Sequence, residues 1–191
     1  MKLIGITGGI GSGKTTVCKI FETLGVPIFC ADVEAKKLMQ ADDRVRNEII
    51  QAFGDDAYNE QRLNRGFLAR IVFNNEIQLD RLNAIVHPAV KRATMKWVDD
   101  NQDSAYGLKE AAILFESGSY KHVAAVINVW APLATRVERV MRRDKVDRES
   151  VMARVSKQIS EPLRLSLSDY VIKNDGEQLL LPQVMRIHHL L

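Results

Sequence analysis

Several kinds of feature are scarce in this chain of 191 residues. Its two cysteines, Cys18 and Cys30, are not spaced as metal ligands, so we expect a reduced protein and not a disulfide framework. No apolar run approaches the roughly 18 residues of a membrane span. No signal-peptide pattern, internal repeat or low-complexity tract is present. The sequence therefore predicts a cytoplasmic protein with no membrane partner.

A large excess of charge of one sign is also missing. The formal net charge is +3, with 27% charged and 46% hydrophobic residues. Such a mild basic excess suits phosphorylated ligands but is weak evidence for nucleic acid, so we expect no nucleic-acid partner. The length and apolar content are enough for one α/β domain with a buried core and a small inserted subdomain.

The most informative stretch is glycine-rich and lies near the N-terminus. Residues 8–15 read GGIGSGKT and match the phosphate-binding pattern G-x-x-x-x-G-K-[S/T]. Residues 2–7 before it suit a buried strand. Residues 16–25 after it have apolar side chains at helical spacing, with Gly25 as a C-terminal cap. A strand, a glycine loop and a helix in this order are the context that the motif requires.

The residue types of this loop suit a triphosphate. Glycines let backbone N–H groups converge on the phosphates, and the following helix N-terminus adds about half a positive charge. Lys14 can reach the β- and γ-phosphates, and the Thr15 hydroxyl can ligate Mg²⁺. The alternative, a glycine-rich turn before an ordinary helix, is disfavoured by the context. The expected nucleotide-binding residues are Gly9, Ile10, Gly11, Ser12, Gly13, Lys14, Thr15 and Thr16.

An acid follows the next apolar run. Residues 26–29 suit a buried parallel strand, which we expect to end at Asp32. Ligands of open α/β sheets bind beyond the carboxyl ends of the strands, so Asp32 is a candidate catalytic residue. The alternative is that it caps a helix predicted over residues 33–40; both roles can hold at once, and the catalytic role is favoured.

Residues 33–104 contain little that indicates a strand and suggest a helical subdomain that binds a phosphate acceptor. Helices are predicted over residues 43–53, 64–73, 76–86 and 89–101, with a polar loop over 54–62. The pair His87-Pro88 should interrupt the last two helices, because a residue before proline avoids the helical region. A structural role at this junction is favoured for His87, with a ligand contact as the alternative.

Strand patterns return in the second half of the chain. Residues 107–116 and 123–130 suit buried strands, the first ended by Glu116. Glu116 could contact Mg²⁺ through water, hold the acceptor, or be a solvated strand end. A short strand over 170–172 precedes a turn with Asn174 and Gly176, where a purine could rest. His188 and His189 should be surface residues without partners.

The basic charge is concentrated in residues 136–164. This segment has nine basic and five acidic residues, an excess of four in a chain whose net charge is +3. Arg136, Arg139 and Arg143 recur at the spacing of one helix face. The alternatives are a solvated basic helix and a lid whose arginines close over transferring phosphates, and the phosphate loop in the same chain favours the lid.

Taken in order, these residues resemble the dephospho-CoA kinase family over nearly the whole chain. The phosphate loop alone is shared by many kinases, so the resemblance depends on the ordered combination. Cys30 departs from the family, which often has an acid there. The matching positions are residues 4–16, 24–27, 31–32, 87–88 and 113–116, Arg139, Arg143-Asp144, Arg154, Gln158, Asp169, 171–172 and 174–176.

The resemblance implies a P-loop nucleotide-kinase fold, a five-stranded parallel sheet flanked by helices. A single domain is expected, with a core of about residues 1–32, 105–140 and 168–191, a substrate subdomain of about 33–104 and a lid of about 141–167.

The implied reaction adds a phosphate from ATP to the ribose 3′-hydroxyl of dephospho-CoA, with Mg²⁺. The roles implied are a general base for Asp32, phosphate stabilisation for Lys14, Arg139, Arg143 and Arg154, acceptor binding for Asp32, His87 and Glu116, and purine binding for Asn174 and Gly176.

Three other functions are alternatives to the one that this resemblance implies. Another small-molecule P-loop kinase, with a nucleotide or sugar acceptor, is the nearest alternative. A GTPase switch would need N-K-x-D and D-x-x-G, and neither string occurs. A non-catalytic nucleotide-binding module would need the acceptor acid or the arginines to be lost, and both are present.

Overall fold

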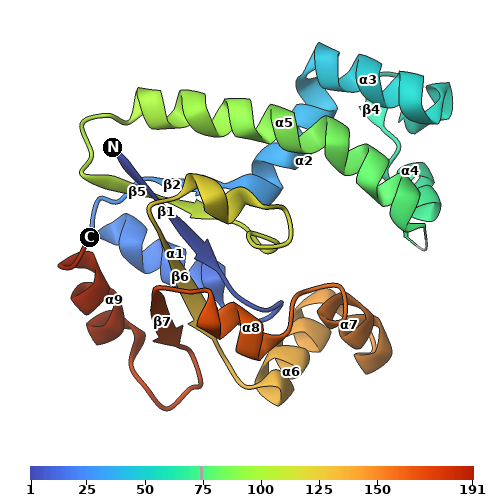
Figure 1. Cartoon of the computed structure of the whole chain (residues 1–191). Coiled ribbons are helices and arrows are strands. Elements are labelled where there is room, and N and C mark those ends of the chain that lie inside the picture. Colours follow the sequence, from blue (N-terminus) through green and yellow to red (C-terminus); the bar gives the residue numbers. More distant parts are fainter. Residues whose placement is uncertain (74) are drawn as a thin grey trace. The chain divides into compact units, whose positions relative to one another are not determined.

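The computed structural model describes residues 1–73 and 75–191. The chain forms two compact units (Figure 1). The first comprises Met1–Cys30 and Val98–Leu191, and the second comprises Ala31–Trp97. The second unit is therefore inserted between two segments of the first. Within the described ranges, no helix is both long and apolar enough to cross a lipid bilayer.

The first unit is built on a parallel sheet of five strands in the order β2-β5-β1-β6-β7. This confirms the predicted sheet. The two strands β1 and β6 are mostly apolar, as expected where helices cover both faces of a parallel sheet. The five strands are β1 (Lys2–Thr7), β2 (Ile28–Cys30), β5 (Tyr106–Glu110), β6 (Ala125–Trp130) and β7 (Tyr170–Lys173).

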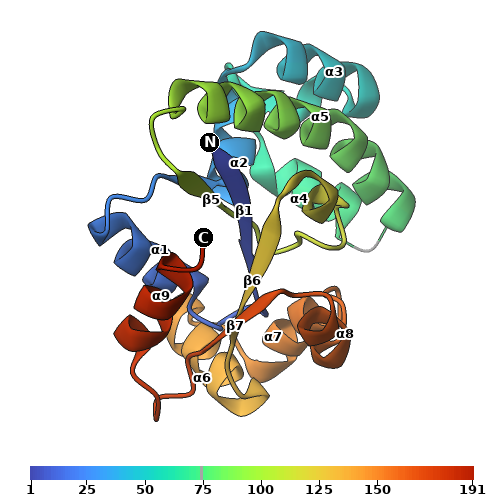
Figure 2. The ribbon, with the colours of Figure 1, turned by 60° about the vertical axis from the view of Figure 1, so that its left-hand side comes forward.

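The central strands and the first helix form the core of this unit. Ile6 of β1, Leu108 of β5 and Ile127 of β6 are fully buried, as is Phe21 of α1 (Lys14–Thr23). The C-terminal helix α9 (Leu180–His188) packs beside α1 (Figure 2). Burying each of these large side chains stabilises the unit by roughly 1.5–3 kcal/mol.

Helix α9 is also held against β5 by a hydrogen bond between Tyr106 and His188, which the sequence does not predict. His188 Nδ1 lies 2.6 Å from the Tyr106 hydroxyl, and burial raises the pKa of Tyr106 to about 12. His189 Nδ1 lies 2.6 Å from the carbonyl oxygen of Met185. The expectation that both histidines lack partners is wrong: α9 folds back against β5 and brings His188 to Tyr106, while exposed His189 contacts a carbonyl one turn earlier in the chain.

Three short helices lie at the end of the sheet where β1 and β6 end: α6 (Leu133–Asp144), α7 (Arg148–Val155) and α8 (Glu161–Ser166) (Figures 1 and 2). Asp147 caps α7 by accepting from the Ser150 backbone N–H. Val137, Val140 and Val151 are fully buried between α6 and α7 and join the two helices.

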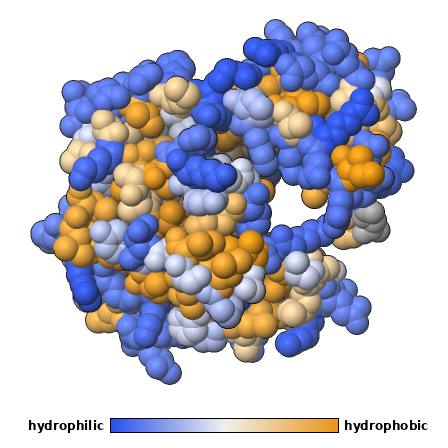
Figure 3. All heavy atoms as spheres, in the orientation of Figure 1, coloured by the Kyte–Doolittle hydropathy of each residue, from blue (hydrophilic) through white to orange (hydrophobic). Residues whose placement is uncertain are grey.

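The second unit is helical, with a core of its own. Val45, Ile49, Leu68 and Ala89 are buried in it. Its visible face is mostly hydrophilic (Figure 3). A small hairpin over residues 58–63 overlaps residues 54–62, which were predicted to be a loop. The elements are α2 (Ala31–Ala41), α3 (Asp43–Phe53), the 3₁₀ helix η1 (Asp55–Ala57), β3 (Tyr58–Asn59), β4 (Arg62–Leu63), α4 (Arg65–Val72) and α5 (Glu76–Asp100).

Pro88 does not interrupt the long helix α5, so the predicted break at His87-Pro88 is wrong. Proline removes one backbone hydrogen bond from a helix. Against that loss, Leu82 and Ile85 before Pro88 and Ala89 after it all pack into the core of the second unit. A continuous apolar face on both sides of the proline keeps the helix in one piece.

Two strands end earlier than the sequence indicates. Strand β2 ends at Cys30, and Asp32 lies in the first turn of α2. Strand β5 ends at Glu110, not at Glu116. The apolar run continues beyond Glu110 because turns bury Leu114 beneath Gly5, where an added Cβ would lie 2.6 Å from the leucine Cδ2. Apolar character alone does not distinguish these turns from a strand.

Candidate active site

The phosphate loop connects β1 to α1 and is closely packed against Arg136 and Asn174. Gly11 and Gly13 have φ angles of 79° and 91°, which favour glycine. A Cβ on Gly11 would lie 2.3 Å from the carbonyl oxygen of Arg136, and one on Gly13 would lie 2.2 Å from Asn174 Nδ2. Glycine is therefore required at both positions for its backbone angles and for its small size.

Lys14, the first residue of α1, forms a hydrogen bond back to the start of the phosphate loop. Lys14 Nζ donates to the carbonyl oxygen of Gly8 at 2.9 Å. The ammonium group thus lies across the loop whose N–H groups are expected to surround the phosphates. The positive end of the α1 dipole adds to this charge, which makes the loop a site for an anion.

Thr15 contacts an acid, Glu110, that is not among the predicted site residues. Its hydroxyl Oγ1 donates to Glu110 Oε1 at 3.0 Å, and the Cys30 thiol donates to Glu110 Oε2 at 3.5 Å. Burial, and next the charge of Glu110, raise the pKa of the Cys18 thiol well above its ordinary range, so Cys18 is a neutral thiol. The sequence pattern does not mark Glu110, because it falls inside the longer strand predicted over residues 107–116.

Arg136 supports the loop from inside the protein. Its Nη2 lies 3.2 Å from Glu161 Oε2, and its Nε donates to the carbonyl oxygen of Ala131. Arg164 Nη1 reaches the same Glu161 oxygen at 2.9 Å. Burial lowers the pKa of Arg136, while the Glu161 charge opposes this shift. Arg136 is therefore buried and does not belong to an open basic face of α6.

Arg139 and Asn174 join the loop after β7 to the phosphate loop. Both terminal nitrogens of Arg139 donate to the carbonyl oxygen of Asn174 at 3.1 Å. The Asn174 side chain donates to the Ser12 carbonyl oxygen at 2.7 Å. Gly176, with φ 93°, makes the turn that follows. The predicted purine-binding turn is thus tied to the phosphate loop by direct hydrogen bonds.

One acid holds two of the predicted lid arginines. Asp144 accepts from Arg143 Nε at 2.7 Å and from Arg154 Nη1 at 2.8 Å. Hydrogen bonds from Arg143 are the largest cause that lowers the pKa of Asp144 to about 2. The two arginines come from α6 and α7, so Asp144 fixes these helices to each other at an exposed surface.

The segment after α7 reaches across to the loop and to the turns after β5. Gln158 Oε1 accepts from the Ile10 backbone N–H at 2.8 Å, and Gln158 Nε2 donates to the Ala112 carbonyl oxygen at 2.9 Å. Glu116 Oε1 accepts from the Ile159 N–H at 2.9 Å. Glu116 therefore lies in a turn and holds this segment, instead of ending a strand.

The other two predicted site residues belong to the second unit. Asp32 is exposed in the first turn of α2, directly after β2. His87 is half-buried in α5, beside Pro88. The structure thus brings Lys14, Thr15, Asn174 and the lid residues together in one unit and places Asp32 and His87 in the other.

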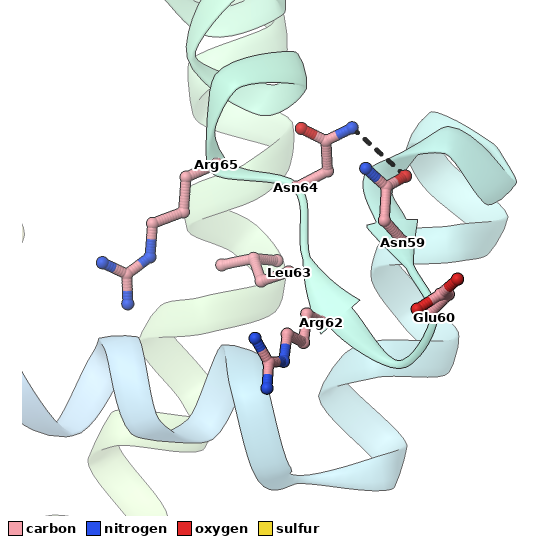
Figure 4. A pocket seen from close by; sticks show the side chains of 6 residues that line it. All are labelled: Asn59, Glu60, Arg62, Leu63, Asn64 and Arg65. Atoms are coloured by element: carbon pink, nitrogen blue, oxygen red, sulfur yellow. Dashed lines mark hydrogen bonds between the residues drawn. The ribbon is translucent and has the colours of Figure 1, made fainter.

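The second unit has a polar pocket of about 630 Å³ near its hairpin. Arg62 and Arg65 extend from β4 and the start of α4 toward the same side of the hairpin, and Glu60 points away (Figure 4). Asn64 donates to the Asn59 side chain at 3.5 Å. Two guanidiniums, one on the hairpin and one at the start of α4, form a site suited to phosphate groups.

A phosphate loop between β1 and α1 of a five-stranded parallel sheet, with a helical insertion and an arginine-bearing segment, defines a P-loop kinase. A family model described as dephospho-CoA kinase matches residues 2–179. The chain therefore belongs to the dephospho-CoA kinase family, and it is a kinase that uses a nucleotide substrate.

Individual proteins are similar over almost the same length. A dephospho-CoA kinase of Salinibacter ruber is 45% identical over 179 residues, which cover 92% of this chain and 90% of the relative. The crystal structure of TT1252 from Thermus thermophilus matches with a TM-score of 0.89 at 33% identity, covering 99% and 96% of the two chains. A dephospho-CoA kinase from Campylobacter jejuni matches with a TM-score of 0.71 at 28% identity, with the same coverage.

Proposed function

We propose that this chain transfers the γ-phosphate of ATP to the ribose 3′-hydroxyl of dephospho-CoA, giving coenzyme A and ADP. Membership of the family supports this acceptor. The observation that carries the chemistry is the intact phosphate loop, with Lys14 folded over it and Thr15 paired with a carboxylate. We place the reaction in the cytoplasm, where free cysteines such as Cys18 and Cys30 stay reduced.

The donor half of the site holds the triphosphate. The loop N–H groups and Lys14 bind its β- and γ-phosphates, and Asn174 and Gly176 support the purine. Bound Mg²⁺, held through the Thr15 hydroxyl and the phosphates, supplies charge neutralisation in such reactions. A threonine hydroxyl paired with a carboxylate fits this ion, because Mg²⁺ prefers oxygen ligands and commonly takes one or two carboxylates besides phosphates.

The acceptor half of the site binds and activates the ribose. Asp32 orients the 3′-hydroxyl and accepts its proton, and His87 and Glu116 contact the acceptor. Dephospho-CoA has a pyrophosphate, and the Arg62–Arg65 pocket offers two cations to such a group. Little covalent chemistry is required of these residues, since positioning supplies much of the rate.

The lid residues act on the phosphoryl group as it moves. Arg143 and Arg154 are partly exposed on their common partner Asp144, so both can exchange that carboxylate for phosphate oxygens. Arg139 acts beside them while holding the Asn174 loop. Guanidiniums that neutralise the transferred phosphate can raise kcat by orders of magnitude, and closure would exclude water as a competing acceptor.

The test is ADP release from Mg-ATP with dephospho-CoA, compared with a panel of nucleoside monophosphates and sugars. We expect release that depends on dephospho-CoA, with NMR of the product showing a 3′-phosphate. Lys14→Ala should lower kcat by orders of magnitude. Release with another acceptor and none with dephospho-CoA would reject the proposed substrate and favour another small-molecule kinase.

A further inference from the structure

Two arginines and one glutamate form a charged cluster inside the first unit, next to the phosphate loop. One oxygen of Glu161, Oε2, lies 3.2 Å from Arg136 Nη2 and 2.9 Å from Arg164 Nη1. Two positive charges therefore share a single negative charge. The arginine side chains are 6% and 3% exposed, whereas that of Glu161 is 20% exposed. Water screens the carboxylate more than it screens the guanidiniums, so this cluster has an excess of positive charge.

Arg136 is the member of this cluster that lies against the loop. A Cβ added to Gly9 would collide with Arg136 Nη1, and one added to Gly11 would collide with the Arg136 carbonyl oxygen. Arg136 Nε donates to the carbonyl oxygen of Ala131 at 3.1 Å, which fixes the direction of the guanidinium. The positive charge of Arg136 therefore has a fixed place in contact with the loop.

An excess charge inside a protein calls for a reason, because a buried charge is costly unless it is paired. Arg164 and Glu161 alone would form a balanced pair, so Arg136 supplies the excess. Electrostatic forces also act more strongly in the interior than in water, because the effective dielectric constant there is lower. The ligand expected in the adjoining loop is an anion. A buried guanidinium packed against the loop would attract such a ligand without contacting it.

We propose that Arg136 is a positioning residue for the nucleotide phosphates, which its charge stabilises through the backbone of the phosphate loop. This inference rests on the proposed ATP-dependent function. It adds a buried cation to Lys14, which is expected to reach the β- and γ-phosphates directly. Arg136 acts on the nucleotide as it binds, whereas the partly exposed Arg143 and Arg154 are proposed to act on the phosphoryl group as it moves.

A purely structural role for Arg136 makes different predictions. If Arg136 only holds the loop in shape, every change that weakens its contacts with Ala131 and Glu161 should weaken ATP binding. If its charge matters, ATP binding should follow the net charge of the cluster. Arg136→Lys keeps the charge and changes the hydrogen bonds, whereas Glu161→Gln weakens the hydrogen bonds and raises the charge. The two roles therefore predict different ATP affinities for both variants.

The first measurement is the affinity for ATP and for adenosine by isothermal titration calorimetry, in EDTA and without an acceptor. Arg136→Met should weaken ATP binding about tenfold and leave adenosine binding unchanged, whereas Arg136→Lys should bind ATP within about threefold of the unmodified chain. The control is Arg142→Met, which removes an equal charge from an exposed position on α6 and should change the ATP affinity less than about twofold. Circular dichroism checks that each variant is folded.

Glu161→Gln tests the sign of the effect. It removes the carboxylate that both arginines share, so the cluster gains one unit of positive charge. Folded Glu161→Gln should therefore bind ATP about threefold more tightly than the unmodified chain, with adenosine binding unchanged. Weaker ATP binding by this variant, or equal losses in Arg136→Lys and Arg136→Met, would overturn the inference. Because no acceptor is present, the expected affinities together with no ADP release on dephospho-CoA would reject only the proposed acceptor.

Discussion

Glu161 balances two guanidiniums that have almost no access to water. The side chains of Arg136 and Arg164 are 6% and 3% exposed, and both contact the same carboxylate oxygen. Removing one partner of a buried ion pair is strongly destabilising because a charge is left uncompensated. Glu161→Gln should therefore lower the free energy of unfolding by about 3 kcal/mol.

Urea denaturation followed by circular dichroism measures this loss. Glu149→Gln, an equal change at an exposed position in the first turn of α7, should cost less than about 0.5 kcal/mol. Equal effects of the two substitutions would mean that Arg136 and Arg164 find other partners or water, and that Glu161 does not support the loop.

Asp144 should make the stability of the α6–α7 pair depend on pH. Hydrogen bonds from Arg143 lower the pKa of the folded carboxyl from 3.8 to about 2. A depressed pKa in the folded state stabilises above the unfolded pKa, and this contribution is lost as pH falls toward the folded pKa. The difference in unfolding free energy between the unmodified chain and Asp144→Asn should therefore shrink between pH 5 and about pH 2.5.

Urea midpoints at these two pH values measure the difference. Asp103→Asn at an exposed position serves as the matched control, and its difference from the unmodified chain should stay nearly constant. A difference for Asp144→Asn that is the same at both pH values would show that the two arginine contacts do not hold in solution.

The segment after α7 is coupled to the phosphate loop by one side chain. Gln158 accepts the Ile10 N–H and donates to the Ala112 carbonyl, so it connects three parts of the first unit. A hydrogen bond of this kind contributes about 1 kcal/mol net. In Gln158→Ala, exchange of the Ile10 amide with deuterium should accelerate about fivefold, with Gln51→Ala on α3 as a control. Unchanged exchange, measured by NMR, would mean that the loop is held without Gln158.

The strands and helices show what the sequence could and could not predict. The strand, loop and helix at the N-terminus were predictable because the loop motif requires a strand before it and a helix after it. The end of β5 was not, because Leu114 and Phe115 are buried in turns as fully as strand residues are. The helix break predicted at Pro88 is wrong for a related reason. Packing on both sides of the proline outweighs the one hydrogen bond that is lost.

The site residues also include some that the sequence predicts and some that only the folded structure identifies. Lys14, Thr15 and Asn174 follow from local motifs, and the structure joins Asn174 to the loop through Ser12. Glu110 could not be found by pattern, because its contact with Thr15 depends on the register that sets it opposite Cys30 and Ile6. Arg136 could not be separated from Arg139 by helical spacing, because burial under Gly9 comes from the folded loop. The surroundings of Glu110 and Arg136 are set by contacts between segments that are distant in sequence.

The two units have separate cores, which should appear as separate steps of local unfolding. Ile49 is fully buried among helices of the second unit, whereas Ile6 and Ile127 are buried in the sheet of the first. Cooperative opening commonly follows such units. Ile49→Ala removes buried methyl groups at a cost of roughly 2–5 kcal/mol. Native-state hydrogen exchange should show this loss at amides of α3 and α5.

The amides of β1 and β6 provide the comparison within the same sample. If the second unit opens by itself, their protection stays near that of the unmodified chain while α3 and α5 lose theirs. Equal losses in both sets of amides would show that the chain opens as one cooperative unit. The distinction bears on the proposed reaction, because Asp32 and His87 lie in the second unit and the phosphate loop in the first. If the second unit binds the acceptor as proposed, its separate opening would release the acceptor while the nucleotide site stays folded.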